Sequence, residues 1–374
     1  MRFTLSSSAL FGRLSALSKV INSKSSMPIL NDFIFDIDGQ VLHLTASDSE
    51  NMMKTYVEIN DCDGNGRFAI NNHDLLEALK GIPEQPITLE VNMELNSAKI
   101  SYQNGHFSLP IENADEFPEA QSLSESASNI QIPCVMLADN LNRSIFATAQ
   151  DEIRPVMNGI YFDLTPDCLA IVASDGHKLV RNKIYTVKSD IPSSFILPKK
   201  PAMLLKNLLG KDEYNVNIRF DDRNAEINYG DGILICRLIE GRYPNYNSVI
   251  PLNNPNTVTV DRISLLSALR RVQPFTSDSS NLVRLRIENN SIKLDAEDYD
   301  FSKTATEMVS CEYNGMPMSI GFKASAFIEI LNNFDCTEVS LQLADPSRAG
   351  LVLPQEQPEN QDVLMLIMPM LISD

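Results

Sequence analysis

The pattern of apolar and polar positions predicts one set of elements that occurs three times along the chain. Each copy opens with an apolar strand and a helix whose apolar residues recur every three or four positions. A second helix then leads into a strand, and an alternating hairpin closes the copy. These elements recur three times in the same order and at similar spacing, which indicates a triplicated unit. The opening, middle and closing segments are 3–21, 70–91 and 99–117; 130–146, 197–220 and 226–246; and 258–272, 321–343 and 350–371.

A short motif falls between the first and second segments of every copy. It reads Ala-Ser-Asp at 46–48 and at 173–175, and Ala-Glu-Asp at 296–298. In the second copy, residues 169–184 predict an apolar strand, a polar turn at 174–176 and an alternating strand. The repeat predicts an α+β fold of three β-rich domains, each with two helices. We expect these domains at 1–126, 127–254 and 255–374.

Capping and helix-breaking residues predict where several helices begin and end. The apolar stripe of the first helix extends to Ile21. Asn72 and Asp261 have side chains suited to N-caps, and Pro133 suits the first turn of a helix. A further helix is expected to begin after Lys200.

The chain is acidic overall, with a formal net charge of −18, but its predicted helices carry mostly basic residues. Residues 1–30 contain four basic residues and no acidic one, and residues 197–211 contain four lysines and no acidic residue. Arg262, Arg270 and Arg271 are the charged residues of the helix after Asp261. We interpret these clusters as a basic surface on equivalent helices, with solvated helix faces of random charge as the alternative. The negative net charge argues against a protein that coats nucleic acid with its whole surface.

Motifs that suggest chemistry lack the partners that the chemistry needs. Residues 61–66 resemble the start of a calcium-binding loop, but position twelve is Asn72 instead of a bidentate Glu. His177 follows Asp175 and could act as a general base, yet no nucleophile is arranged with it. The four histidines have no metal-ligand spacing. We therefore expect no catalytic residue, no cofactor and no metal site.

Cysteine spacing and hydropathy indicate a cytoplasmic protein. The six cysteines are far apart, without a Cys-x-x-Cys pair, and predict free thiols in a reducing compartment. The first residues lack the apolar core of a signal peptide. The longest apolar run, 363–372, is too short to span a bilayer and is interrupted by Pro369. We expect no membrane segment.

Five motifs in order along the chain carry a family resemblance. They are Met-Pro-Ile-Leu at 27–30, Asn-Gly at 158–159, Ala-Ser-Asp-Gly-His-Lys-Leu at 173–179, Gly-Arg-Tyr-Pro-Asn-Tyr at 241–246 and Met-Pro-Met at 368–370. With the triplication and the basic helices, the chain resembles the β sliding clamps of bacterial DNA polymerase III over essentially its whole length. The resemblance implies a head-to-tail homodimer whose six domains close into a ring, with helices lining the hole and sheets outside.

The resemblance implies a non-catalytic processivity factor for DNA replication. Its partners would be double-stranded DNA, encircled without regard to sequence, and the replicative polymerase, the clamp loader and repair factors, bound through short linear motifs. Two other readings remain open: a three-module scaffold that does not encircle DNA, and a hydrolase that uses Asp175 and His177.

The site residues expected from the resemblance fall into three groups. Lys24 and Lys200 match DNA-contact positions of the family, while Arg270 and Arg271 are added from helix charge alone. The dimer interface would use Phe107, Leu109, Pro274 and Phe275. The peptide groove would be lined by Met157, Ser174, Gly176, His177, Lys178, Leu179, Pro244, Ser248, Val249, Met368, Pro369 and Met370.

The chain departs from the family pattern at three places near the expected groove. Lys178 and Ser248 stand where arginine is common in the family, and Leu371 follows Met370 where the family commonly has arginine. A groove without these cations is expected to prefer a different peptide.

Overall fold

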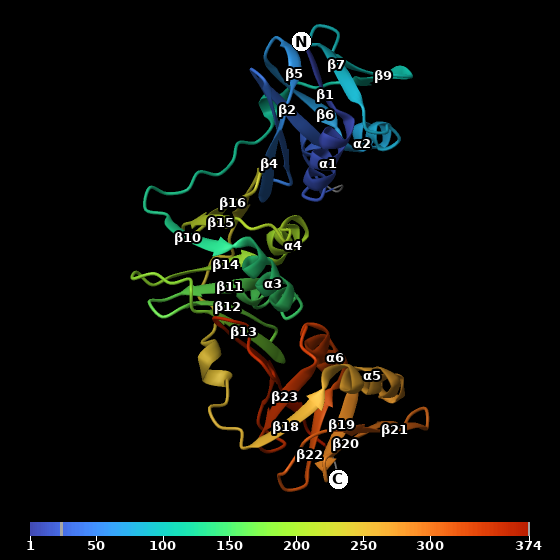
Figure 1. Cartoon of the computed structure of the whole chain (residues 1–374), viewed down its shortest axis with the longest axis vertical. Helices are drawn as coiled ribbons and strands as arrows, with labels where there is room; N and C mark the ends of the chain where they lie inside the picture. Colours follow the sequence, from blue (N-terminus) through green and yellow to red (C-terminus); the bar gives the residue numbers. More distant parts are fainter. Residues whose placement is uncertain (23–24, 373–374) are drawn as a thin grey trace. The chain divides into compact units, whose positions relative to one another are not determined.

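The computed structural model describes residues 1–22 and 25–372, which form two compact units. Unit 1 contains residues 1–137 and 203–238, and unit 2 contains residues 138–202 and 239–372. Each unit therefore joins one outer copy of the repeat to a part of the middle copy (Figure 1). In each unit, one five-stranded and one eight-stranded antiparallel sheet carry the helices.

The sheets of unit 1 join the first copy of the repeat to the middle copy through one strand pair, β4 with β17. The five-stranded sheet has the order β5 (Asn60–Asp63), β1 (Arg2–Ser6), β7 (Pro86–Asn92), β8 (Ser97–Tyr102), β9 (Gly105–Pro110). The eight-stranded sheet has the order β10 (Ser128–Pro133), β15 (Asn215–Phe220), β16 (Asn224–Tyr229), β17 (Gly232–Arg237), β4 (Asn51–Glu58), β3 (Val41–Ser47), β2 (Asp32–Asp38), β6 (Gly66–Asn71).

The sheets of unit 2 repeat this plan, with β13 of the middle copy paired to β25 of the third copy. The eight-stranded sheet has the order β14 (Ser193–Pro198), β11 (Gly159–Leu164), β12 (Leu169–Ser174), β13 (Lys178–Ile184), β25 (Gln361–Ile367), β24 (Gly350–Pro354), β23 (Glu338–Leu343), β18 (Asn256–Asp261). The five-stranded sheet has the order β21 (Lys303–Ser310), β20 (Ser291–Asp298), β19 (Leu282–Glu288), β22 (Met318–Lys323), β26 (Pro369–Met370).

Six α-helices in the described part of the chain confirm the prediction of two helices per copy. They are α1 (Ser7–Leu17), α2 (Asn72–Lys80), α3 (Cys134–Ile145), α4 (Lys199–Leu208), α5 (Arg262–Val272) and α6 (Ala324–Asn332). Short 3₁₀ helices connect other segments: η1 (Pro28–Asn31), η2 (Ala114–Glu116), η3 (Pro155–Met157), η4 (Tyr246–Val249) and η5 (Gln273–Phe275).

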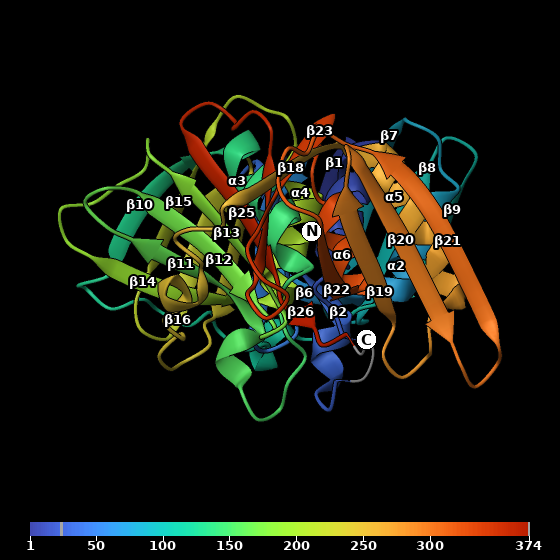
Figure 2. The ribbon, with the colours of Figure 1, turned by 90° about the horizontal axis from the view of Figure 1, so that it is seen from below.

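Apolar stripes explain why the helices lie on the sheets. Leu10, Leu14 and Leu17 of α1 are buried, and α1 packs on α2, β3 and β4. In unit 2, α5 packs on α6 and against β20 and β21, which lie side by side with β19 in Figure 2. Each fully buried leucine contributes about 2 kcal/mol to folding. The packing of these stripes therefore stabilises helices too short to be stable alone.

Several predicted helix boundaries were wrong by a few residues. Helix α1 ends at Leu17, so Ile21 lies beyond the helix that was expected to include it. The N-cap of α2 is Asn71, whose side chain accepts hydrogen bonds from His73 N and Asp74 N, and Asn72 is the first helical residue. The sequence pattern allowed both asparagines, because either offers the side chain that an N-cap needs.

Two further boundaries were wrong and one was right. Pro133 ends β10 and precedes α3 instead of lying in its first turn. Helix α4 includes Lys199 and Lys200 instead of following them. Asp261 is the N-cap of α5, as predicted, and its carboxylate accepts a hydrogen bond of 2.7 Å from Ser264 N.

The described residues contain no helix long and apolar enough to cross a membrane. In these same parts of the chain, no three His, Cys, Asp or Glu side chains gather as a metal site would require. All six cysteines are free thiols, as predicted.

Asp32 of β2 is a buried carboxyl group near the start of α2. Its Oδ1 accepts a hydrogen bond of 3.3 Å from the side-chain amide of Asn71, the α2 cap. Burial, and then the nearby charge of Glu112, raise the pKa of Asp32 to about 6. In the unfolded chain an aspartate has a pKa of about 4, so the folded state binds the proton of Asp32 more tightly. The contribution of Asp32 to the free energy of unfolding is therefore most favourable at low pH, and it is lost as the pH rises through about 6.

We therefore predict that Asp32→Asn increases the free energy of unfolding by about 1–2 kcal/mol at pH 8 and by almost nothing at pH 4. Urea unfolding followed by circular dichroism at both pH values measures the difference. Asp36→Asn is the matched control, because Asp36 is exposed on the same strand. An equal gain from Asp32→Asn at both pH values would contradict a raised pKa.

Candidate functional site

The hairpin of β12 and β13 ends in a turn that its own side chains hold, here called the second-repeat turn (residues 174–178). Ser174 Oγ donates to the Lys178 carbonyl at 2.8 Å and accepts from Gly176 N at 3.1 Å. Asp175 Oδ1 accepts from the backbone N–H groups of His177 and Lys178 at 2.8 and 2.9 Å. Gly176 has a φ of +90°, a conformation that favours glycine. The Ala-Ser-Asp-Gly-His motif is therefore explained by turn geometry.

This geometry gives Asp175 a structural role. Burial would raise the pKa of its carboxyl, but the ammonium group of Lys178 and the two backbone N–H groups lower it below the usual range. A carboxylate held in this way is a poor proton acceptor. His177 contacts Asp175 through its backbone N–H, and its imidazole is exposed. Among the described residues, none is arranged as a nucleophile beside this imidazole.

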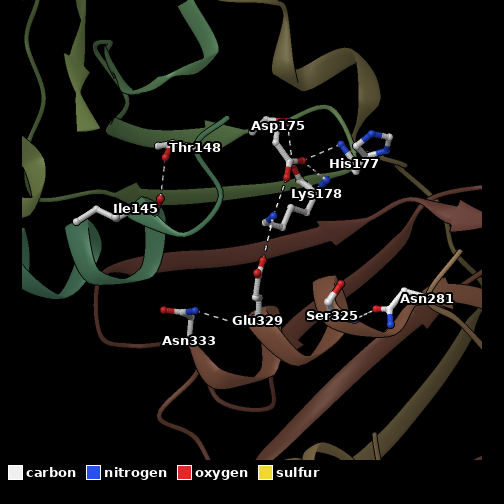
Figure 3. Close-up of polar contacts among 10 residues, drawn as sticks. Ile145, Thr148, Asp175, His177, Lys178, Asn281, Ser325, Glu329 and Asn333 are labelled. Atoms are coloured by element: carbon white, nitrogen blue, oxygen red, sulfur yellow. Dashed lines mark hydrogen bonds and ion pairs between the residues drawn. The ribbon is translucent and has the colours of Figure 1, made fainter. Parts of the chain in front are cut away.

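Lys178 lies at the centre of a small ionic cluster (Figure 3). Its Nζ is 2.6 Å from Asp175 Oδ2 and 3.0 Å from Glu329 Oε2 on α6, and 6.0 Å from the centre of the Phe146 ring. Burial would lower its pKa, but the hydrogen bonds and charges of Asp175 and Glu329 raise it. The side chain is only 11% exposed, so its ammonium group interacts with these two carboxylates and is largely inaccessible to a ligand. Sequence reasoning missed Glu329, because no local pattern links α6 to this turn.

Arg154 brings a second cation to the turn, and sequence reasoning also missed it. Its Nε is 2.8 Å from Asp151 Oδ2. A Cβ atom at Gly176 would lie 3.3 Å from Nη1 of Arg154, so the guanidinium lies against the backbone of the turn. About half of its side chain is exposed. This region therefore has an accessible guanidinium group, although Lys178 and Ser248 replace the expected arginines.

The motif at 241–246 supplies an aromatic support for the exposed Pro244. Tyr243 and Tyr246 are buried, and the ring of Tyr161 stacks on Tyr243 with centroids 4.7 Å apart. The hydroxyl of Tyr246 donates to Asp163 Oδ2 at 2.8 Å. Burial raises the pKa of both tyrosines, so they remain neutral. Because the two rings are fixed, the intervening proline is held at the surface.

The C-terminal segment lies beside the second-repeat turn. Lys178 pairs with Ile367 in the β13–β25 ladder, and Met368 N donates to the His177 carbonyl at 2.8 Å. Pro369 and Met370 then form β26, which pairs with β22. The structure thus brings together the residues expected from 174–179 and from 368–370.

The remaining expected groove residues are on nearby short helices of unit 2. Met157 is buried at the end of η3, whose Val156 packs on the cluster of Leu179, Tyr243 and Tyr246. Val249 and Met368 expose apolar side chains, at 52% and 40%. Ser248 Oγ donates to the Asn245 carbonyl at 2.7 Å, and Leu371 is 91% exposed.

The six helices have a charge opposite to that of the rest of the chain. They carry nine basic and four acidic residues, whereas the whole chain has a net charge of −18. Lys200 is in the first turn of α4, and Arg270 donates to the side-chain oxygen of Asn332 at 2.7 Å. Arg271 donates twice to Glu307, at 2.6 and 2.8 Å, so its charge is paired. Lys24 lies outside the described residues.

Of the four residues expected at a subunit interface, two are in an edge strand and two are in a 3₁₀ helix that packs against another edge strand. Phe107 and Leu109 are in β9, the last strand of its five-stranded sheet, and are partly exposed. Pro274 and Phe275 are in η5, which packs against β20 and the edge strand β21. An unpaired edge offers backbone N–H and C=O groups to a strand of another chain.

Comparison with known proteins covers almost the entire chain. Models of the N-terminal, central and C-terminal domains of the DNA polymerase III beta subunit match residues 1–121, 131–245 and 247–371. The beta sliding clamps of Pseudomonas aeruginosa and Haemophilus influenzae are 26% and 25% identical, over 99% of this chain and 100% of each relative.

Solved structures of sliding clamps have the same fold. A DNA polymerase sliding clamp from Pseudomonas aeruginosa is 26% identical, with a TM-score of 0.93 and full coverage of both chains. Another from the same organism, bound to griselimycin, has a TM-score of 0.93 at 25% identity and full coverage. The DNA polymerase III beta subunit of Thermotoga maritima has a TM-score of 0.89 at 25% identity, again with full coverage.

Three domain matches in order, full-length relatives and a shared fold agree with the repeat, the turn motif and the C-terminal segment described above. The chain belongs to the DNA polymerase III beta subunit family, the sliding clamps, and serves DNA replication as a non-catalytic processivity subunit.

Proposed function

We propose that two copies of this chain close head to tail into a ring that encircles duplex DNA and tethers the replicative polymerase to it. The observation that carries this proposal is the separation of charge between basic helices and an acidic remainder. A protein that holds DNA through phosphate contacts alone binds less tightly as the salt concentration rises, so raised salt releases it. A closed ring needs only weak attraction at its inner surface, because topology keeps it on the DNA.

The basic residues of the helices are the proposed DNA contacts. Lys24, Lys200 and Arg270 would attract phosphates toward the centre of the ring, while the acidic remainder repels DNA from other surfaces. Arg271 is the weakest member of this set, because a phosphate would have to compete with its two hydrogen bonds to Glu307.

The proposed ring is closed by strand pairing between chains. Edge strand β9 of one chain would meet the β21 edge of its partner, with Phe107, Leu109, Pro274 and Phe275 supplying apolar contacts. Such a contact uses different surfaces of the two chains, and it forms a ring when the rotation between them closes. Pairing would also remove two exposed sheet edges that otherwise favour aggregation.

We further propose that polymerase, clamp loader and repair factors bind a groove beside the second-repeat turn through short linear motifs. The exposed apolar atoms of Met368 and Val249 lie on the same unit as Pro244 and the buried Leu179. Flexible methionine side chains adapt to different apolar anchors. Griselimycin, which binds the Pseudomonas aeruginosa clamp, is a candidate ligand for this groove. A cytoplasmic location fits these partners.

Cations determine which peptides this groove prefers. Lys178 is ion-paired with Asp175 and Glu329, whereas the half-exposed Arg154 beside the turn is accessible to a ligand. We propose that an acidic residue of a bound motif would lie toward Arg154.

The ring predicts different behaviour on closed and open DNA. After assembly by a cognate loader at raised salt, we expect the protein to remain on nicked circles and to leave the same circles once they are linearised. Gel filtration that separates DNA-bound from free protein measures retention. Equal loss from both forms would exclude the topological mechanism and would favour a scaffold that does not encircle DNA.

A charge at the β9 edge should open the ring. We predict that Leu109→Lys shifts the protein from dimer to monomer, because the ammonium group would be buried in an apolar contact. Light scattering during size-exclusion chromatography measures the mass. Leu95→Lys is the control, because Leu95 is 73% exposed in the β7–β8 turn. A dimeric Leu109→Lys variant would contradict the proposed interface.

Loss of a groove methionine should weaken peptide binding. We predict that Met370→Ala weakens binding of a tail peptide of the cognate polymerase by about tenfold or more, as expected when an anchor contact is removed. Fluorescence anisotropy with the labelled peptide measures the affinity. Met316→Ala, at a methionine that is 81% exposed elsewhere in unit 2, should have no effect. Unchanged affinity of the Met370→Ala variant would disprove the groove assignment.

A further inference from the structure

The first copy of the repeat contains a turn with the same hydrogen bonds as the second-repeat turn. In this first-repeat turn (residues 47–51), Ser47 Oγ donates to the Asn51 carbonyl at 3.0 Å, against 2.8 Å for the equivalent bond. Asp48 Oδ1 accepts from the backbone N–H groups of Glu50 and Asn51 at 3.0 and 2.7 Å, against 2.8 and 2.9 Å. The two turns are therefore equivalent bond for bond.

The equivalence includes the residue with a left-handed backbone. Ser49 has a φ of +77° where Gly176 has +90°, and Ser49 N donates to Ser47 Oγ at 3.0 Å, as Gly176 N donates to Ser174. A serine in this conformation is strained, whereas a glycine is not. The first-repeat turn keeps its shape in spite of this strain.

The neighbouring strand of the ladder, β17 in the first copy and β25 in the second, also meets the turn in the same way. Arg237 N donates to the Glu50 carbonyl at 3.0 Å, as Met368 N donates to the His177 carbonyl at 2.8 Å. Arg237 thus occupies the position of Met368, and Glu50 that of His177. Beneath them Met52 pairs with Ile235, in the register in which Leu179 pairs with Leu366.

The two sites differ at their rims, the pair of side chains at Glu50 and Arg237 in the first repeat and at His177 and Met368 in the second. In the first repeat, Arg237 Nη1 is 3.6 Å from Glu50 Oε1, so an ion pair stands where the second repeat has a methionine and a histidine. The cavity beside this pair, also lined by Met52, Pro118 and Ile235, measures about 20 Å³. That volume holds about one water molecule. It does not hold the side chain of an apolar anchor.

The ion pair excludes apolar anchors mainly through solvation. Both side chains are about half exposed, so the attraction between them is weak. An apolar side chain placed on the rim would remove water from both charged groups without replacing their hydrogen bonds. The same anchor on Met368 would replace water on an apolar surface.

We propose that residues 47–52, Pro118, Ile235 and Arg237 form a second docking frame that the Arg237–Glu50 pair keeps closed to apolar motifs. Each chain then offers one open groove and one closed counterpart for the same class of ligand, an extended peptide with apolar anchors. This inference rests on the proposed groove at the second-repeat turn, whose rim supplies the comparison.

Copying the open rim onto the closed frame tests the proposal. The full-length variant Glu50→His/Arg237→Met is titrated calorimetrically with the polymerase tail peptide and, separately, with griselimycin. We expect the wild type to bind one ligand per chain and the variant to bind two. When Met368→Ala/Met370→Ala is added to disable the open groove, the rim variant should retain one ligand per chain.

A matched variant separates charge from side-chain size. Glu50→Asp/Arg237→Lys keeps both charges, so it should stay at one ligand per chain. Thermal unfolding shows whether all variants are folded. A folded rim variant that still binds one ligand would overturn the proposal, and so would a wild type that binds two.

The two proposals fail in different ways. If the wild type binds no ligand but the rim variant binds one, the closed frame is supported and the groove assignment is wrong. If neither binds, both assignments fall. Retention on circular DNA is a separate property of the ring and does not depend on either site.

Discussion

Backbone hydrogen bonding across the repeat boundaries is the constraint on which the structure depends. β4 pairs with β17, and β13 pairs with β25, so each eight-stranded sheet continues from one copy of the repeat into the next. A buried strand must satisfy its N–H and C=O groups, and these ladders do so without a separate interface. They also determine where the turns lie, because each turn leads directly into a strand of the boundary ladder. The candidate groove is therefore a product of the way in which adjacent copies join.

Electrostatics adds a second level of organisation to this framework. Helix residues are basic on balance, while the strands and loops carry the excess of carboxylates. Some helix cations are held by partners within the fold, as Arg271 is by Glu307 and Arg13 by Asp231. Local ion pairs thus reduce the basic potential of the helices. A moderate potential suits a protein that must remain near DNA while it moves along it.

Much of the fold could be predicted from the sequence, because triplication makes weak periodic signals reinforce one another. The six helices, the β12–β13 hairpin and the Asp261 cap followed from spacing and capping chemistry. The choice between Asn71 and Asn72 did not, since both have the same side chain. Glu329 and Arg154 could not be found, because their contacts with the second-repeat turn join segments that no local pattern connects. The peptide-groove residues, Lys24 and Lys200 came from family resemblance, while Arg270 and Arg271 came from helix charge. Residue spacing alone would have assigned the groove methionines to the core.

The two equivalent turns separate what folding requires from what recognition requires. Ser47 and Asp48, like Ser174 and Asp175, have their hydrogen-bonding groups occupied by the turn itself. The rim residues take part only through their backbone, so their side chains are free to differ between copies. After a duplication, one rim could diverge to reject ligands while the other diverged to accept them, with little cost to the scaffold. Because the turn supplies its own hydrogen bonds, the rim side chains of either copy can change without loss of the fold.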